Sequence, residues 1–342
     1  MSMRALAITA LAFVLLVAVA LIGQRSPDDA SRSDTLFAPG LGARFDDIES
    51  IVVRKAGDEI VATLNQVEKG WVVAERSGYP ADTSKIRAAL VAISDARIVE
   101  AKTSNPELYE RLGLGDLTSE DSRAVSLTLL PESPSTPTMI FGDSEGTSYR
   151  YARLEGDPQT VLISADPELP TDTADWLLPQ ILDVRGDRIE RIVISHADGE
   201  RLELYKNEVG QSNFEVADIP EGRALQYPGV ANVTGNVLRD LRFEDVAILG
   251  DSPAPEVTAE FTTFDGLVVR AEGFTIDGDG WLRFTARQDT EFTDSDPESD
   301  AATEAAAINR IVEGWRYRIA SYQYDQLTRR VEDLLRAEDS TN

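Results

Sequence analysis

The longest apolar stretch of the chain runs from Ala5 to Ile22 and contains no charged residue. At about 1.5 Å rise per residue, a helix of this length spans roughly 27 Å, close to the hydrocarbon thickness of a bilayer. We therefore expect residues 1–22 to form a retained, single-pass membrane anchor; a signal peptide cleaved after Ala20 is the alternative. Both interpretations place the body on the periplasmic, extracytoplasmic side of the inner membrane.

Beyond this stretch, residues 23–44 are mostly polar and contain glycine and proline, which predicts a flexible tether. Three short segments follow at 48–55, 59–64 and 70–75. They are rich in valine and isoleucine and are separated by turn residues, as in an antiparallel meander. Further strands are expected at 124–130, 136–141, 148–154 and 160–164.

Two helices are expected in the first half of the body. Asp82 can cap one of them, and its apolar residues recur at helical spacing: Ile86, Leu90 and Ile93. Asn105 and the proline after it begin a shorter helix that ends at Gly113. Residues 169–182 predict a closing helix or turn.

The pattern then begins again, because residues 48–64 align without a gap on residues 189–205. Phe214 takes the place of Trp71, and a second helix is expected around Leu238 and Leu241. Three more strands are expected at 256–263, 267–274 and 281–286. The sequence predicts an α+β protein in which a membrane helix precedes two repeated modules of antiparallel sheet plus helices, at 45–183 and 186–338.

The second module carries two further features. Residues 289–304 are acidic and contain a proline, which predicts a solvated loop. A C-terminal helix is expected from about Tyr322, with one apolar face formed by Leu327, Val331 and Leu334.

Composition narrows the range of partners and chemistry. The chain has 342 residues and a formal net charge of −27, so its field repels nucleic acid, which we do not expect as a partner. It has no cysteine, which excludes disulfides, thiolate metal sites and cysteine nucleophiles. Its single histidine, His196, excludes multi-histidine metal sites.

A set of residues in the first module carries a family resemblance. It consists of Trp71, the run Tyr79-Pro80-Ala81-Asp82, the run Tyr109-Glu110-Arg111-Leu112-Gly113-Leu114, Ile140-Phe141-Gly142, Tyr149–Arg153 and Val161. This pattern resembles the bacterial family called domain of unknown function 4340. The resemblance implies one N-terminal membrane helix, a repeated extracytoplasmic α+β body and an auxiliary role beside ABC-type transporters. It implies no catalytic residues.

Individual motifs point to no catalytic, cofactor-binding or metal site. His196 aligns with Lys55 and is interpreted as an exposed polar residue. The Asp277–Asp279 segment is interpreted as a β-turn, because Trp281 occupies the third ligand position of a calcium loop. Gly113-Leu114-Gly115 lacks the context of a phosphate loop. The four tryptophans are expected to be core anchors: Trp71, Trp176, Trp281 and Trp315.

The leading functional hypothesis is a membrane-anchored extracytoplasmic binding protein, auxiliary to an ABC-type transport or envelope complex and without catalysis or cofactor. It would contact the membrane through Ala5–Ile22 and a protein partner through its body. One alternative is a cell-envelope hydrolase that uses two carboxylates. Another is a small-ligand receptor with a site between the two modules.

Overall fold

The computed structural model describes residues 35–68, 70–134, 136–251, 253–289 and 300–337. The predicted anchor Ala5–Ile22 lies outside these residues. Among those described, no helix is long and apolar enough to cross a membrane. The described chain forms two compact units: unit 1 comprises residues 35–74 and 81–176, and unit 2 comprises residues 75–80 and 177–337. Each contains one large antiparallel sheet, which confirms the predicted α+β class.

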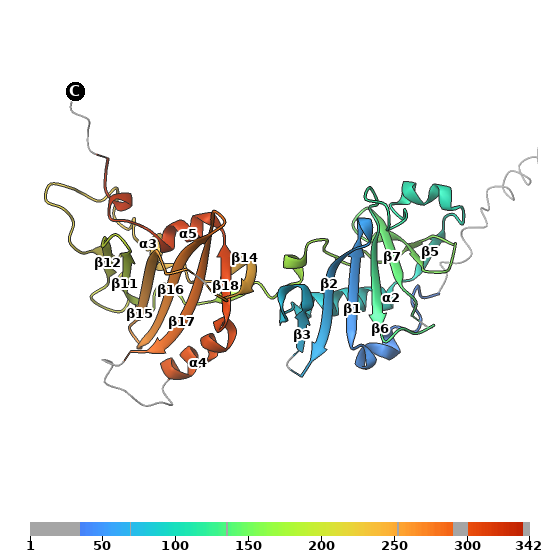
Figure 1. Cartoon of the computed structure of the whole chain (residues 1–342), viewed down its shortest axis with the longest axis horizontal. Coiled ribbons are helices and arrows are strands. Elements are labelled where there is room, and N and C mark those ends of the chain that lie inside the picture. Colours follow the sequence, from blue (N-terminus) through green and yellow to red (C-terminus); the bar gives the residue numbers. More distant parts are fainter. Residues whose placement is uncertain (1–34, 69, 135, 252, 290–299, 338–342) are drawn as a thin grey trace, which may run out of the picture. The chain divides into compact units, whose positions relative to one another are not determined.

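The sheet built from unit 1 has the strand order β4-β3-β2-β1-β6-β7-β8-β9-β5, and its short edge strand β4 comes from residues 75–80, which are grouped with unit 2 (Figure 1). Its strands are β1 (Ser50–Lys55), β2 (Glu59–Val67), β3 (Gly70–Val73), β4 (Tyr79–Pro80), β5 (Ile98–Ala101), β6 (Val125–Leu130), β7 (Met139–Glu145), β8 (Tyr149–Leu154) and β9 (Val161–Ile163). Neighbours in this order pair antiparallel, as the alternating sequence predicts.

Helix α2 (Thr83–Asp95) covers one face of this sheet and lies behind it in Figure 1. The Asp82 carboxylate accepts hydrogen bonds from the backbone N–H groups of Ser84 and Lys85, which confirms the predicted cap. The apolar face of α2 is buried, and so are alternate residues of the central strands. The buried residues are Ile86, Ala89, Leu90 and Ile93 in α2, Ile51 and Val53 in β1, and Leu127 and Leu129 in β6. Burial of these residues forms the main core of unit 1.

The predicted tether is wrong for residues 35–44. Phe37, Ala38 and Leu41 are buried, and the Phe37 N–H donates to the Ala96 carbonyl at 2.8 Å. A 3₁₀ helix, η2 (Gly42–Asp47), then leads into β1. Three apolar residues among polar ones are sufficient to anchor this stretch to unit 1.

The sheet of unit 2 has the order β10-β14-β18-β17-β16-β15-β11-β12-β13. Its strands are β10 (Gln180–Leu182), β11 (Ile189–His196), β12 (Arg201–Tyr205), β13 (Glu215–Val216), β14 (Leu241–Ile248), β15 (Val257–Thr263), β16 (Leu267–Ile276), β17 (Asp279–Gln288) and β18 (Trp315–Ile319). The three strands predicted at 256–286 correspond to β15, β16 and β17 and are confirmed.

Both sheets share one order of strands. In unit 1 the central series is β3-β2-β1-β6-β7-β8-β9-β5, and in unit 2 it is β13-β12-β11-β15-β16-β17-β18-β14. In each series, the three strands that come first in sequence form a meander at one side. The next strand of the series in sequence, β5 or β14, lies at the opposite side and pairs with the one that comes last in sequence, β9 or β18.

Several helix predictions for unit 2 are wrong. The four-residue helix α3 (Asn232–Gly235) precedes Leu238, and Leu241 begins β14, because Asp240 has a φ of 46° and turns the chain between them. The predicted acidic loop is also wrong at its end, since α4 (Asp300–Val312) begins within it. The C-terminal helix α5 (Ser321–Leu327) is shorter than predicted.

Helix α5 ends because later polar groups bond elsewhere. The Val331 N–H donates to the Glu200 carboxylate at 3.0 Å instead of to a helical carbonyl. Arg329 donates to the Val230 carbonyl at 3.1 Å. A short 3₁₀ turn, η7 (Glu332–Leu334), then buries Leu334.

Candidate functional site

The second face of the unit 1 sheet, the face opposite Ile51 and Val53, carries a small second core and a recess. Its core consists of Tyr109, Leu114, Ala124 and Ile140. The 3₁₀ helix η5 (Pro106–Leu112) supplies Tyr109, and the predicted start and end of this element are confirmed: the Asn105 side chain caps it and Gly113 ends it with a φ of 69°.

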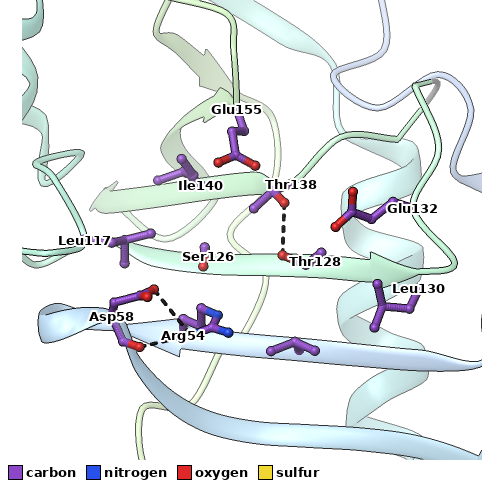
Figure 2. A pocket seen from close by; sticks show the side chains of 11 residues that line it. Arg54, Asp58, Leu117, Ser126, Thr128, Leu130, Glu132, Thr138, Ile140 and Glu155 are labelled. Atoms are coloured by element: carbon purple, nitrogen blue, oxygen red, sulfur yellow. Dashed lines mark hydrogen bonds and ion pairs between the residues drawn. The ribbon is translucent and has the colours of Figure 1, made fainter.

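The recess lies beside this second core and has a volume of about 360 Å³ (Figure 2). Strand register explains its lining, because Arg54 pairs with Ser126, Val52 pairs with Thr128, and Ser126 in turn pairs with Ile140. Side chains of directly paired residues lie on the same face of a sheet. The lining consists of Val52, Arg54, Asp58, Leu117, Ser126, Thr128, Leu130, Glu132, Thr138, Ile140 and Glu155.

Hydroxyl groups occupy the middle of the recess. The Thr128 and Thr138 hydroxyls hydrogen-bond each other at 3.0 Å. Ser126 is only 2% exposed as a residue and lines the recess, and its hydroxyl hydrogen-bonds to no group of the described chain. A serine hydroxyl both donates and accepts, so it is available to whatever enters the recess.

Charged groups lie toward the two ends of the recess and differ in sign. At one end, Arg54 Nη1 donates to the Asp58 carbonyl at 3.0 Å and lies 3.4 Å from its carboxylate. Glu132 lies at the other end, near Leu130, and Glu155 lies across β7, where its backbone N–H donates to the Thr138 carbonyl at 2.8 Å (Figure 2). Within the described part of the chain these two carboxylates have no ion-pair partner.

Unit 2 has a larger recess, of about 570 Å³, that is internally neutralised. Arg270 and Arg283 both line it, and both pair with Glu272, with Arg270 Nε 3.0 Å from that carboxylate. Asn309 also lines this recess, and its side-chain amide makes two hydrogen bonds with the Ala286 backbone. Asn309 Oδ1 accepts from the Ala286 N–H, and Asn309 Nδ2 donates to the Ala286 carbonyl. Both arginines of this recess therefore share one carboxylate, and the Asn309 amide is used through both Oδ1 and Nδ2, whereas in unit 1 Arg54 uses only Nη1 for Asp58.

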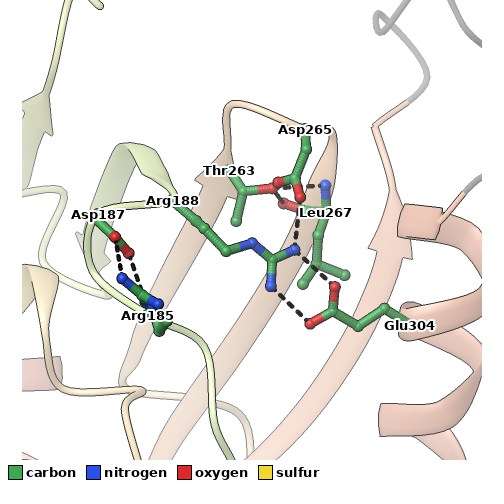
Figure 3. A network of polar contacts seen from close by, with 7 residues as sticks. All are labelled: Arg185, Asp187, Arg188, Thr263, Asp265, Leu267 and Glu304. Atoms are coloured by element: carbon green, nitrogen blue, oxygen red, sulfur yellow. Dashed lines mark hydrogen bonds and ion pairs between the residues drawn. The ribbon is translucent and has the colours of Figure 1, made fainter. Parts of the chain in front are cut away.

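A polar network in unit 2 connects α4 to the turn between β15 and β16. The Arg188 guanidinium donates to both oxygens of Glu304, at 3.0 and 2.7 Å, and to Asp265 at 2.7 Å (Figure 3). The hydrogen bond with Glu304 raises the pKa of Arg188. Burial alone would raise the pKa of Asp265, but hydrogen bonds from Thr263 and Arg188 lower it overall. In this network the charges of Arg188, Asp265 and Glu304 compensate one another and connect α4 to the turn between β15 and β16.

The residues considered from sequence lie apart from the unit 1 recess or have structural roles. His196 ends β11 and is half-buried, with Nε2 3.3 Å from the Arg329 carbonyl, so the expectation of an exposed residue is wrong. Asp277 and Gly278 form the two-residue turn between β16 and β17, as predicted. Among the residues described, no three metal-ligating side chains form a cluster.

The tryptophan prediction holds only in part. Trp176 is 1% exposed and its indole donates to the Pro170 carbonyl at 3.1 Å. Trp71, Trp281 and Trp315 are half-buried instead of fully buried. Arg316 lies over the ring of Trp281 at 5.2 Å from its centroid.

The recess residues were not identified as a site from sequence. The strand Val125–Leu130 does contain a signal, since its hydroxyl residues Ser126 and Thr128 alternate with Leu127 and Leu129. This pattern does not show which strand lies beside it. Only the register of β1 on β6 places Arg54 opposite Ser126.

The fold defines an α+β protein of two antiparallel sheets, and the recess adds a polar pocket on one of them. The chain belongs to the family described as a domain of unknown function (DUF4340), whose family model matches residues 71–261, more than half of the chain. This match includes the β6 and β7 side of the recess and excludes Arg54 and Asp58. No curated protein and no solved structure matches the chain.

Proposed function

We propose that the protein is a membrane-anchored, extracytoplasmic binding protein, auxiliary to an ABC-type transport or envelope complex and without catalysis of its own. The apolar stretch Ala5–Ile22 supports the anchor and the periplasmic location. The family resemblance implies the association with transporters.

The recess of unit 1 is the observation that carries the binding function. It combines an apolar floor, from Val52 and Ile140, with a few polar groups whose hydrogen-bonding capacity is incompletely used. Such a combination is typical of small-molecule sites, and a volume of about 360 Å³ lies within their usual range. In this proposal the ligand site lies within one module and not between two.

The common strand order supports a tandem duplication as the origin of the body. The sequence alignment of residues 48–64 on 189–205 superposes the hairpin β1–β2 on the hairpin β11–β12, each the start of its unit. We propose that one module was duplicated and that unit 1 retained the recess.

A crosslinked pull-down of the full-length protein from solubilised membranes tests the proposed function. We expect a transporter permease or ATPase in stoichiometric amount, identified by mass spectrometry, and no enrichment with an unrelated anchored protein of similar abundance. Recovery of the protein alone would contradict its role as an accessory component.

A further inference from the structure

We propose that the unit 1 recess binds a short zwitterionic peptide of about three residues, with its carboxylate at Arg54 and its ammonium group at Glu132 and Glu155. This inference rests on the proposed function as a binding protein and names the class of ligand.

The two ends of the recess offer complementary partners for the two charges of a free peptide. Arg54 uses Nη1 for Asp58, and within the described chain its Nε and Nη2 donate to no acceptor. These two nitrogens form the fork that binds a carboxylate through two parallel hydrogen bonds. Glu132 and Glu155 can together accept hydrogen bonds from an ammonium group.

The spacing of the ends sets the length of the ligand. Arg54 lies opposite Ser126, and Glu132 follows the end of β6, whose last residue Leu130 lies four residues beyond Ser126. At about 3.3 Å per residue, this separation is roughly 13 Å. An extended tripeptide spans about 10 Å, and hydrogen-bonding side chains at each end reach across the remainder. A single free amino acid is too short to engage both ends at once.

The middle of the recess suits a peptide backbone. The unpartnered Ser126 hydroxyl can donate to a peptide carbonyl or accept from a peptide N–H. Thr128 and Thr138 have acceptor capacity left after their mutual hydrogen bond. Val52, Leu130 and Ile140 provide apolar surface for small side chains.

Other small ligands satisfy only part of this lining. A neutral sugar would pair with the hydroxyls but leave Arg54 and the two glutamates without counter-charges. A polyamine would pair with the glutamates but leave Nε and Nη2 of Arg54 without an acceptor. A zwitterion of matching length satisfies both ends and the middle.

Titration calorimetry on the full-length wild-type protein in detergent tests the inference without any substitution. Trialanine is the first probe, compared with N-acetyl-trialanine and with trialanine amide. We expect trialanine to bind with Kd below about 1 mM, and each blocked peptide to bind at least roughly tenfold more weakly, because each lacks one charge-assisted contact. Equal binding of all three peptides, or no heat with trialanine at this concentration, would overturn the inference.

Two variants test which end of the peptide lies at which end of the recess. Arg54→Gln should weaken trialanine binding roughly tenfold but leave the affinity for trialanine amide unchanged. Glu132→Gln combined with Glu155→Gln should likewise weaken trialanine binding but leave the affinity for N-acetyl-trialanine unchanged. Arg87→Gln on α2 and Glu221→Gln in unit 2 are matched controls that should change neither affinity. A loss that is the same for free and blocked peptides would contradict the assigned orientation.

The two proposals fail in distinguishable ways. Failure of trialanine to bind, while the pull-down still recovers a transporter subunit, would reject the peptide ligand and leave the accessory function standing. Binding of trialanine with no partner recovered would reject the accessory function and leave the peptide ligand standing.

Discussion

At the residue scale, Gly113 brings the end of η5 close to β7 on the second face of the unit 1 sheet. It ends η5 with a φ of 69°, and a Cβ built there would lie 2.4 Å from the Asp143 carboxylate. The left-handed conformation favours glycine at this C-cap, and the close approach excludes any side chain. Its neighbour Leu114 is fully buried in the second core, so the position of Gly113 fixes how the end of η5 packs into that core.

We expect Gly113→Ala to lower the free energy of unfolding by about 2–4 kcal/mol, from backbone strain plus the clash. Gly146→Ala is the matched control, because its φ is 71° but nothing lies within 4 Å of the added Cβ. It should cost only about 1 kcal/mol. Urea unfolding measures both, and equal losses would show that the clash with Asp143 is relieved at little cost.

Tyr79 and Tyr317 are a second pair with a measurable consequence. Burial raises the pKa of Tyr79 to about 12, although its hydrogen bond with Tyr317 opposes the rise. Burial, followed by the interaction with Tyr79, raises the pKa of Tyr317 as well. A raised pKa means that the folded state holds the phenol proton more tightly, so this stability is complete below pH 10 and is lost above it.

We therefore expect the free energy of unfolding to fall as pH increases from about 10 to 12, by roughly 2–3 kcal/mol from Tyr79 alone. Urea titrations at several pH values measure this slope. Tyr317→Phe removes one phenol and should make the slope shallower, while Tyr322→Phe, at a residue 67% exposed, should not. An unchanged slope in Tyr317→Phe would exclude this origin.

At the scale of elements, local sequence accounts for the strands better than for the helices. Alternation fixed which residues of β1, β6 and β15 face a core, because that pattern needs only the period of the strand. Helix α4 also had a local signal, with Ala301, Ala305, Ile308 and Val312 buried at helical spacing. By contrast, α5 ends where Glu200, distant in sequence, accepts the Val331 N–H.

The Arg188 network predicts how α4 is held. We expect Arg188→Met to lower the free energy of unfolding by about 1–2 kcal/mol, since its ion pairs are about one third exposed and partly screened. It should also reduce the loss of stability in acid. The pKa of Asp265 is lowered in the folded state, so its contribution is present above its unfolded pKa and is lost as pH falls through the folded value.

Arg185→Met is the control for this experiment. Its ion pair with Asp187 lies beside the network in Figure 3, but its side chains are 69% and 59% exposed. Its removal should leave stability nearly unchanged, because solvent screens so exposed an ion pair. Urea unfolding at neutral pH and near pH 3 compares the two variants, and equal effects would contradict a role for Arg188 in docking α4.

At the scale of the whole molecule, the proposed anchor determines where the two units act. Leu15→Arg combined with Leu16→Arg should release the protein from membranes, because each charge at the centre of a helix costs a few kcal/mol to insert. Membrane fractionation measures the outcome. Val209→Arg, at a residue 75% exposed in unit 2, should remain in the membrane fraction. Retention of the double variant would show that Ala5–Ile22 is not the membrane attachment.

The sequence by itself determined the α+β class, the antiparallel strands, the cap at Asp82 and the membership of the family, because each depends on the period or type of neighbouring residues. Only the tertiary structure decided the strand order, the early end of α5 and the recess. Arg54 and Ser126 are far apart in the chain and become neighbours through the register of β1 on β6. Register depends on which distant strand pairs with which, and no local pattern specifies that partner.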